Sequence, residues 1–183
     1  MAMWWWLPVL ALAAWAIFVF NRLVRLRNQT RTAWADIDVQ LQRRHDLVPQ
    51  LVAAVRGYAG HESATLQAVT ELRAQALALR QPGQLEGVES ALEQALTRLL
   101  ALQEAYPDLK ADANFSQLQR DLVETEEHLQ YARRFYNGAV RDYSNAVQRV
   151  PDLLVARTAG FGAIEFFQAE ADSRAAVKVE MQP

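Results

Sequence analysis

An uncharged apolar run at the N-terminus is the strongest constraint that this sequence places on its fold. From Met1 to Phe20 the chain reads MAMWWWLPVLALAAWAIFVF, without a charged residue. In a helix that rises about 1.5 Å per residue, about 20 residues span the roughly 30 Å hydrocarbon core of a bilayer. The run therefore predicts a transmembrane anchor over residues 1–20, and the rest of the chain is expected to fold while attached to a membrane.

Arginines on only one side of this run predict its orientation. No basic residue precedes the run, whereas four arginines and no acidic residue follow it directly: Arg22, Arg25, Arg27 and Arg31. A cleaved signal peptide would have the opposite order, with its basic residues in front. The positive-inside rule places the arginines in the cytoplasm, against anionic headgroups, and Trp4, Trp5 and Trp6 at the opposite interface. We expect a single-pass protein with membrane lipids among its partners.

Composition beyond the anchor is typical of long helices and excludes several classes of site. Gly and Pro are scarce, with 7 and 6 residues in a chain of 183, while helix-forming residues dominate. The absence of cysteine excludes disulfides and thiolate zinc sites. A formal charge of −2 gives no sign of the basic face that nucleic-acid binding requires, so no nucleic-acid partner is expected.

A heptad pattern predicts a long helix over residues 115–150. Its two sets of core positions are Phe115, Leu122, Leu129, Tyr136, Tyr143 and Val150, and Leu118, Thr125, Ala132, Ala139 and Ala146. A matching apolar stripe follows the anchor, and it predicts that the first helix leaves the membrane without a break and ends near Tyr58. Two shorter helices are predicted between the long ones, at Glu62–Leu79 and Val88–Tyr106.

The lengths of these helices predict how they pack. Short connections make successive helices antiparallel, so four helices can pack together only far from the membrane. Near the membrane, we expect both the aromatic-rich segment after Pro151 and further copies of the chain to cover the long pair. The predicted fold is all-α: a transmembrane helix continues into an antiparallel bundle of two long and two shorter helices over residues 21–150, and a C-terminal amphipathic segment and tail follow over residues 151–183.

Charged residues interrupt the apolar face of the first helix in the segment IDVQLQRRHDLVPQLV, residues 37–52. Counting back from the far end of two antiparallel helices places Arg44 within about one turn of Glu126, and Asp38 near Arg133. We interpret these four residues as a structural polar layer, in which Arg44 pairs with Glu126 and Asp38 with Arg133. Such pairs fix the register of a bundle more than they stabilise it, because each ion is costly to desolvate.

A catalytic or metal-binding role for the histidines is the alternative interpretation. His45 and His61 each precede a carboxylate, but they lie too far apart, on one helix and its following turn, to share an obvious metal. His128 stands among Glu and Gln residues, as expected of a solvated face. No glycine-rich phosphate loop and no nucleophile beside a base is present. We predict no enzyme, no catalytic residue, no cofactor and no metal, and leave a role for His45 or His61 open.

Five segments of the chain are similar to those of a known family. They are LRNQTRTAWADIDVQLQRRHDLVPQLV (residues 26–52), YAGHESATL (58–66), EAYPDLKADANFSQLQRDLVETE (104–126), ARRFYNGAVRDYSNAV (132–147) and GFGAIEFF (160–167). In these segments the chain resembles the LemA family of bacterial membrane proteins. The resemblance implies one N-terminal helix in the bacterial inner membrane and a cytoplasmic bundle of long antiparallel helices. It implies little about activity, since members are discussed with membrane proteases, envelope stress and magnetosome membranes.

Two functions follow as hypotheses. In the first, anchored bundles associate side by side through exposed apolar strips and form a homo-oligomeric scaffold at the inner membrane surface. In the second, the bundle is an adaptor that recruits a membrane protease or another envelope partner. The sequence favours the scaffold, because the unequal helix lengths and the surplus of Phe after Pro151 leave apolar surface to cover.

Overall fold

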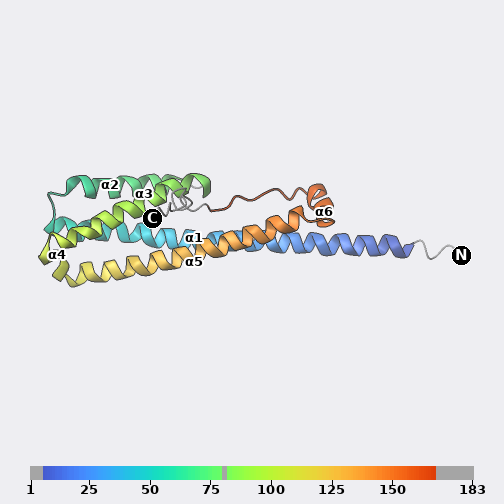
Figure 1. The fold of residues 1–183 in the computed structure, drawn as a ribbon, viewed down its shortest axis with the longest axis horizontal. Coiled ribbons are helices and arrows are strands. Elements are labelled where there is room, and N and C mark those ends of the chain that lie inside the picture. Colours follow the sequence, from blue (N-terminus) through green and yellow to red (C-terminus); the bar gives the residue numbers. More distant parts are fainter. Residues whose placement is uncertain (1–5, 80–81, 168–183) are drawn as a thin grey trace, which may run out of the picture. The chain divides into compact units, whose positions relative to one another are not determined.

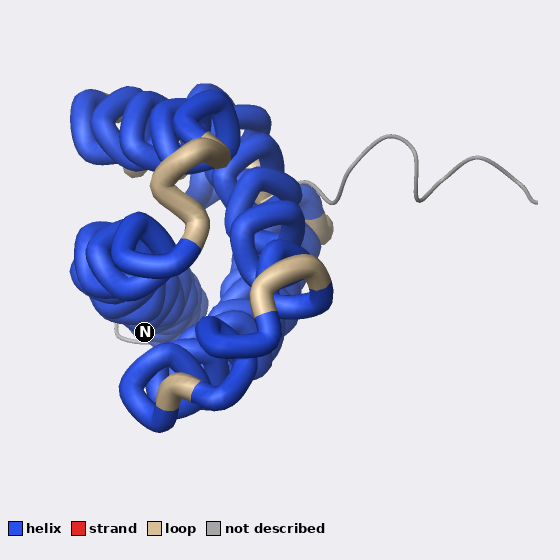
Figure 2. Tube along the Cα trace, turned by 90° about the vertical axis from the view of Figure 1, so that its left-hand side faces the viewer, coloured by secondary structure: helices blue, strands red, loops and turns tan. Residues whose placement is uncertain are grey.

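The described part of the protein, residues 6–79 and 82–167 of a computed structural model, consists of helices joined by short loops (Figure 1). The helices are α1 (Trp6–Tyr58), α2 (Ser63–Ala78), α3 (Pro82–Ala101), the 3₁₀-helix η1 (Leu102–Glu104), α4 (Pro107–Ala111), α5 (Ala113–Gln148) and α6 (Asp152–Thr158). Within these ranges no strand occurs, as the trace coloured by secondary structure shows (Figure 2). The prediction of an all-α fold with two long and two shorter helices is confirmed.

The first helix contains the apolar run and continues past it without interruption. α1 is 53 residues long, and among the described helices it is the one that is long and apolar enough to cross a membrane. Its most apolar window has a mean hydropathy of 1.9, and only 11% of that window is buried. Trp6, Leu10 and Phe18 are all more than half exposed. An apolar stretch with so little protein around it is suited to a lipid environment.

The boundaries of two helices differ from the sequence prediction. α3 begins at Pro82 and not at Val88, because proline is favoured in the first turn, where its missing N–H leaves no hydrogen bond unmade. The long helix ends at Gln148, so the prediction that Val150 is a core position is wrong: it is 74% exposed. At its other end, Asp112 caps α5 by accepting a hydrogen bond from the Phe115 N–H at 2.7 Å.

The described residues fall into two compact units, and both α1 and α5 enter each of them. The first unit contains residues 6–44 and 124–166, and the second contains residues 45–123 and Phe167. In the second unit, the C-terminal part of α1, α2, α3 and the start of α5 enclose one apolar core. Its fully buried members include Leu51, Val55, Val69, Leu92, Leu99, Leu109 and Phe115. Four helical segments thus pack together in this unit, as a bundle requires.

In the first unit, α1 and α5 pack as an antiparallel pair. Arg44 of α1 lies against Glu126 of α5. Ten residues back along α1, the Trp34 ring contacts Tyr136, which is ten residues further along α5. The heptad seam between the helices is buried, with exposed fractions of 4% for Leu41 and 0% for Leu129. The two contacts therefore share one register along this part of the pair.

The segment after α5 folds back onto this pair in the first unit. α6 ends in a Schellman motif, in which the Phe161 N–H donates to the Ala156 carbonyl and Gly160 adopts a left-handed φ of 72° that favours glycine. The extended chain beyond it is held by two tyrosines of α5: the Tyr143 hydroxyl donates to the Gly162 carbonyl and that of Tyr136 to the Glu165 carbonyl. Part of the segment after Pro151 therefore covers the long pair.

Candidate functional site

A buried arginine forms the centre of the polar layer in the first unit. The Arg44 side chain is 0% exposed, and its Nη1 donates to Glu126 Oε1 at 2.9 Å. Glu126 is 22% exposed, so its carboxylate also reaches solvent. On the surface beside it, Arg43 Nη2 lies 3.5 Å from Glu124 Oε2. The two α1 arginines therefore face two α5 glutamates, one pair partly buried and one exposed.

His45, the residue after Arg44 on α1, forms a buried pair within the second unit. His45 Nε2 lies 2.8 Å from Glu89 Oε1 of α3, and the Glu89 side chain is 0% exposed. Glu89 was not among the residues predicted for the polar layer. Its position in the sequence indicates that it is buried, because it continues the buried stripe formed by Leu85, Leu92 and Leu96 of α3. A lone acid on an apolar stripe indicates a buried partner, which here is a histidine.

Pro49 creates a third polar contact, because it has no N–H. In a regular helix the His45 carbonyl would accept from residue 49, so it needs another donor. Arg73 of α2 supplies it, with Nε 2.7 Å from the His45 oxygen. His45 thus connects three helices of the second unit: its own α1, α2 through its carbonyl and α3 through its ring. Arg73 was not among the residues predicted for the polar layer.

The contact between Arg73 and the His45 carbonyl gives a testable prediction. Replacing Arg73 with methionine should lower the free energy of unfolding by about 1.5–3 kcal/mol, the range for a hydrogen bond from a charged donor. In a Pro49→Ala background the loss should shrink, because residue 49 then has an N–H that can donate to the same carbonyl. Guanidinium unfolding of all four variants in mild detergent measures this coupling. An equal loss in both backgrounds would contradict this account.

The other two members of the predicted polar layer lie on the same helix pair. The Asp38 carboxylate accepts a hydrogen bond from Trp34, one turn earlier on α1. Partial burial raises the pKa of Asp38 above its ordinary value, while that hydrogen bond acts in the opposite direction. Arg133 is half-buried on α5. The pairing of Asp38 with Arg133 stays a prediction.

The residues predicted to meet the membrane interface lie on or before α1. Trp4 and Trp5 fall outside the described residues, whereas Trp6 begins the helix and is 66% exposed. The four predicted arginines, Arg22, Arg25, Arg27 and Arg31, are all exposed residues. Arg22 also has a protein partner, since its Nη1 lies 3.0 Å from Asp152 Oδ2 at the start of α6.

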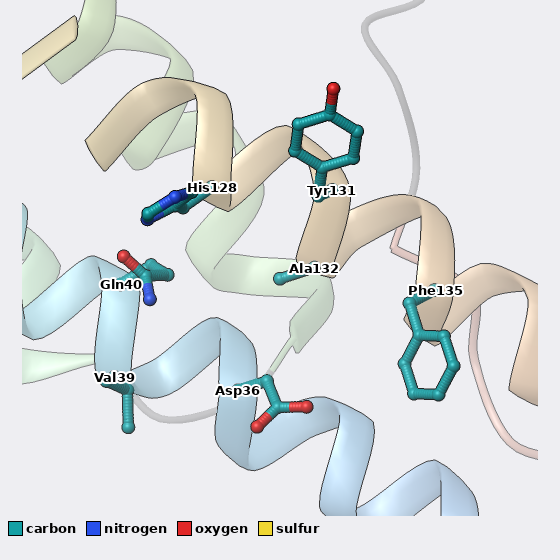
Figure 3. A pocket seen from close by; sticks show the side chains of 7 residues that line it. All are labelled: Asp36, Val39, Gln40, His128, Tyr131, Ala132 and Phe135. Atoms are coloured by element: carbon teal, nitrogen blue, oxygen red, sulfur yellow. The ribbon is translucent and has the colours of Figure 1, made fainter. Parts of the chain in front are cut away.

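An open groove runs between α1 and α5 in the first unit (Figure 3). Its cavity volume is about 340 Å³, and it is lined by Asp36, Val39 and Gln40 of α1 and by His128, Tyr131, Ala132 and Phe135 of α5. Three large side chains on its rim, those of Val39, Tyr131 and Phe135, are more than half exposed. Arg134 lies over the Tyr131 ring, with Cζ 4.6 Å from its centroid. The groove therefore presents an apolar and aromatic surface with Asp36, Gln40 and His128 as its polar residues, and Arg134 lies beside it over the Tyr131 ring.

A metal ion would need several His, Asp or Glu side chains close together. Within residues 6–79 and 82–167, no three His, Asp or Glu side chains lie close enough together to hold one. His61 is exposed in the turn after α1, and His128 is exposed on α5. The expectation of no metal and no cofactor stays a prediction.

Comparison with known proteins identifies the family. The model of the LemA family matches residues 33–181, which is most of the chain. The chain belongs to the LemA family. All residues of the polar layer lie inside the matched segment, whereas the apolar run at the N-terminus lies before it. The family and the apolar start of α1 together describe a membrane-associated helical protein.

Relatives of this LemA-family chain include magnetosome proteins. MamQ 1 and MamQ 2 of Paramagnetospirillum magneticum are each 25% identical to it over 191 residues. MamQ of Magnetospirillum gryphiswaldense is 20% identical over 187 residues. In each case the alignment covers 88% of this chain and 69% of the relative. The similarity therefore extends over most of both proteins.

Proposed function

We propose that this protein is a non-enzymatic scaffold, anchored by the start of α1 in the bacterial inner membrane and assembled from identical copies on the cytoplasmic side. The proposal rests mainly on the groove between α1 and α5. Val39, Tyr131 and Phe135 place large apolar and aromatic side chains on an open rim. Aromatic residues of this kind supply much of the binding energy at protein interfaces. The similarity to LemA-family and magnetosome proteins supports a role at a membrane.

A second copy is the occupant that best fits the groove. Asp36 lies 16 residues beyond Phe20 on one helix, about 24 Å from the end of the apolar run. Anchored copies therefore carry the groove at the same height above the membrane, and confinement to one membrane raises their effective concentration. Asp36, which lines the groove, and Arg134, which lies over the ring of the lining residue Tyr131, can meet across two neighbouring copies. Opposite charges at equal height favour such a side-by-side contact.

The oligomeric state of groove variants tests this proposal. Wild-type protein extracted together with its native lipids is expected to form particles of several copies. Phe135→Glu places a charge in the contact and should shift most particles to single copies, measured by single-particle mass determination. Val123→Ser is the matched control, since Val123 is also an exposed apolar residue of α5 but lies outside the groove lining. It should leave the mass unchanged.

Two results would overturn the scaffold. If the wild type is found only as single copies at every protein density in the membrane, self-association is excluded. Particles that contain one copy and a different protein, lost in Phe135→Glu but not in Val123→Ser, would instead identify the groove as the docking site of an adaptor.

A further inference from the structure

The segment after α5 packs against the apolar run itself. In the first unit, Ala146 of α5 and Ala156 of α6 form a buried cluster with Val19 and Leu23 of α1. Trp15 packs against this cluster, and the Phe161 ring lies edge-on to Phe20 with 5.6 Å between centroids. The ion pair between Arg22 and Asp152 joins the start of α6 to the same stretch of α1. Figure 1 shows α6 beside α1 there.

These contacts determine how close α6 lies to the lipid. Phe20 ends the apolar run, and Trp15 lies five residues inside it, about 7.5 Å along the helix. Amphipathic helices in a membrane interface bury their apolar face by about 5–10 Å. If the apolar run spans the bilayer, the segment that covers its last turns therefore lies at the depth of the headgroups and of the first carbons of the acyl chains.

The outer face of the segment has the composition that this depth requires. Asp152 and Ala156 face the protein and are buried, whereas Leu154 is 64% exposed and Val150 is 74% exposed. Arg149, at the start of the segment, and Arg157, on α6, are exposed as well. Apolar side chains beside arginines match the boundary between acyl chains and anionic headgroups.

We propose that α6 and the residues just before it form a second membrane contact, an interfacial element that places Val150 and Leu154 among lipid chains and presents Arg149 and Arg157 to anionic headgroups. The inference rests on the proposed membrane anchor. It assigns a ligand to α6 and the residues just before it, in addition to their role in packing. That ligand is the anionic lipid of the leaflet that faces the arginines after the apolar run. The protein then contacts the bilayer both through the start of α1 and through the segment that follows α5.

The experiment uses the absence of cysteine from the chain. Single cysteines replace Leu154, Ile17 or Val123, and each full-length variant is labelled with an environment-sensitive fluorophore in vesicles of phosphatidylcholine and phosphatidylglycerol. Nitroxide groups on the lipid chains quench fluorophores that lie in the membrane. We expect quenching at Leu154→Cys to approach that at Ile17→Cys, which lies in the apolar run. It should exceed several-fold that at Val123→Cys, an exposed residue of the second unit.

The outcomes distinguish this inference from the anchor on which it rests. Quenching at Ile17→Cys but not at Leu154→Cys would overturn the interfacial element and leave the anchor intact. No quenching at Ile17→Cys would remove the anchor and the inference with it. If the Leu154→Cys label is shielded from aqueous iodide only at high protein density, a second copy covers this face and the lipid does not. Adding R149Q and R157Q should reduce lipid quenching at Leu154→Cys, and no reduction would contradict the headgroup contact.

Discussion

Replacing Glu89 with alanine is expected to lower the free energy of unfolding by about 3–5 kcal/mol, because it leaves a buried polar group without its partner and opens a cavity in the bundle. Glu89 is 0% exposed and His45 is 6% exposed, and their side chains meet at 2.8 Å. Without the carboxylate, His45 Nε2 would be enclosed in the bundle without this partner, and the truncated side chain would leave a cavity. Both effects lower the free energy of unfolding.

A double variant separates the loss of the partner from the loss of volume. Replacing both His45 and Glu89 with leucine fills the same space with apolar atoms and leaves no polar group behind. This variant should recover most of the stability that Glu89→Ala loses, because buried pairs can often be exchanged for apolar residues at little cost. Guanidinium titrations in mild detergent, followed by helical circular dichroism, measure both. A loss below about 1 kcal/mol for Glu89→Ala would show that the pair does not contribute as described.

Helix packing along the seam could be predicted because its periodicity reports burial directly. Leu122, Leu129 and Tyr136 occupy successive heptad positions, and all three are buried. Because both helices rise by a constant distance per residue, the position on α5 that faces Arg44 could be found by counting residues along the two helices. The structure places Arg44 2.9 Å from Glu126. A long-range contact can be counted in this way only where both partners lie on long, uninterrupted helices.

Contacts of the short helices could not be obtained by the same counting. Arg73 and Glu89 lie on α2 and α3, whose positions relative to α1 depend on loop conformation and on side-chain packing. The predicted start of α3, at Val88, was six residues too late, so the predicted helix left out Leu85, which with Leu92 and Leu96 marks the buried face that contains Glu89. Asp38 illustrates a further limit. The Trp34 indole, one turn away on the same helix, donates to it, and a local donor of this kind needs no long-range register.

The buried pair in the first unit should respond unequally to the loss of each partner. Glu126→Ala leaves the Arg44 guanidinium, which is 0% exposed, enclosed without that carboxylate, and should cost about 3 kcal/mol or more. Arg44→Met keeps an apolar stem of similar length, and the remaining Glu126 is already 22% exposed and can turn toward water. Arg44→Met should therefore lower the free energy of unfolding by only about 1 kcal/mol. Guanidinium unfolding in mild detergent measures both, and equal costs would contradict the asymmetry.

The double variant R44M/E126M tests whether the pair sets the register of α1 and α5. It should be nearly as stable as the wild type, because apolar side chains of similar length replace both ions. Spin labels on cysteines at the exposed positions Asn28 and Asn145 report the distance between the two helices by pulsed spin resonance. If the pair fixes the register, the distance distribution should broaden in the double variant although its stability is kept. An unchanged, narrow distribution would assign the register to the apolar seam of Leu41, Leu129 and Tyr136 instead, since only that seam would then distinguish one alignment of the helices from its neighbours.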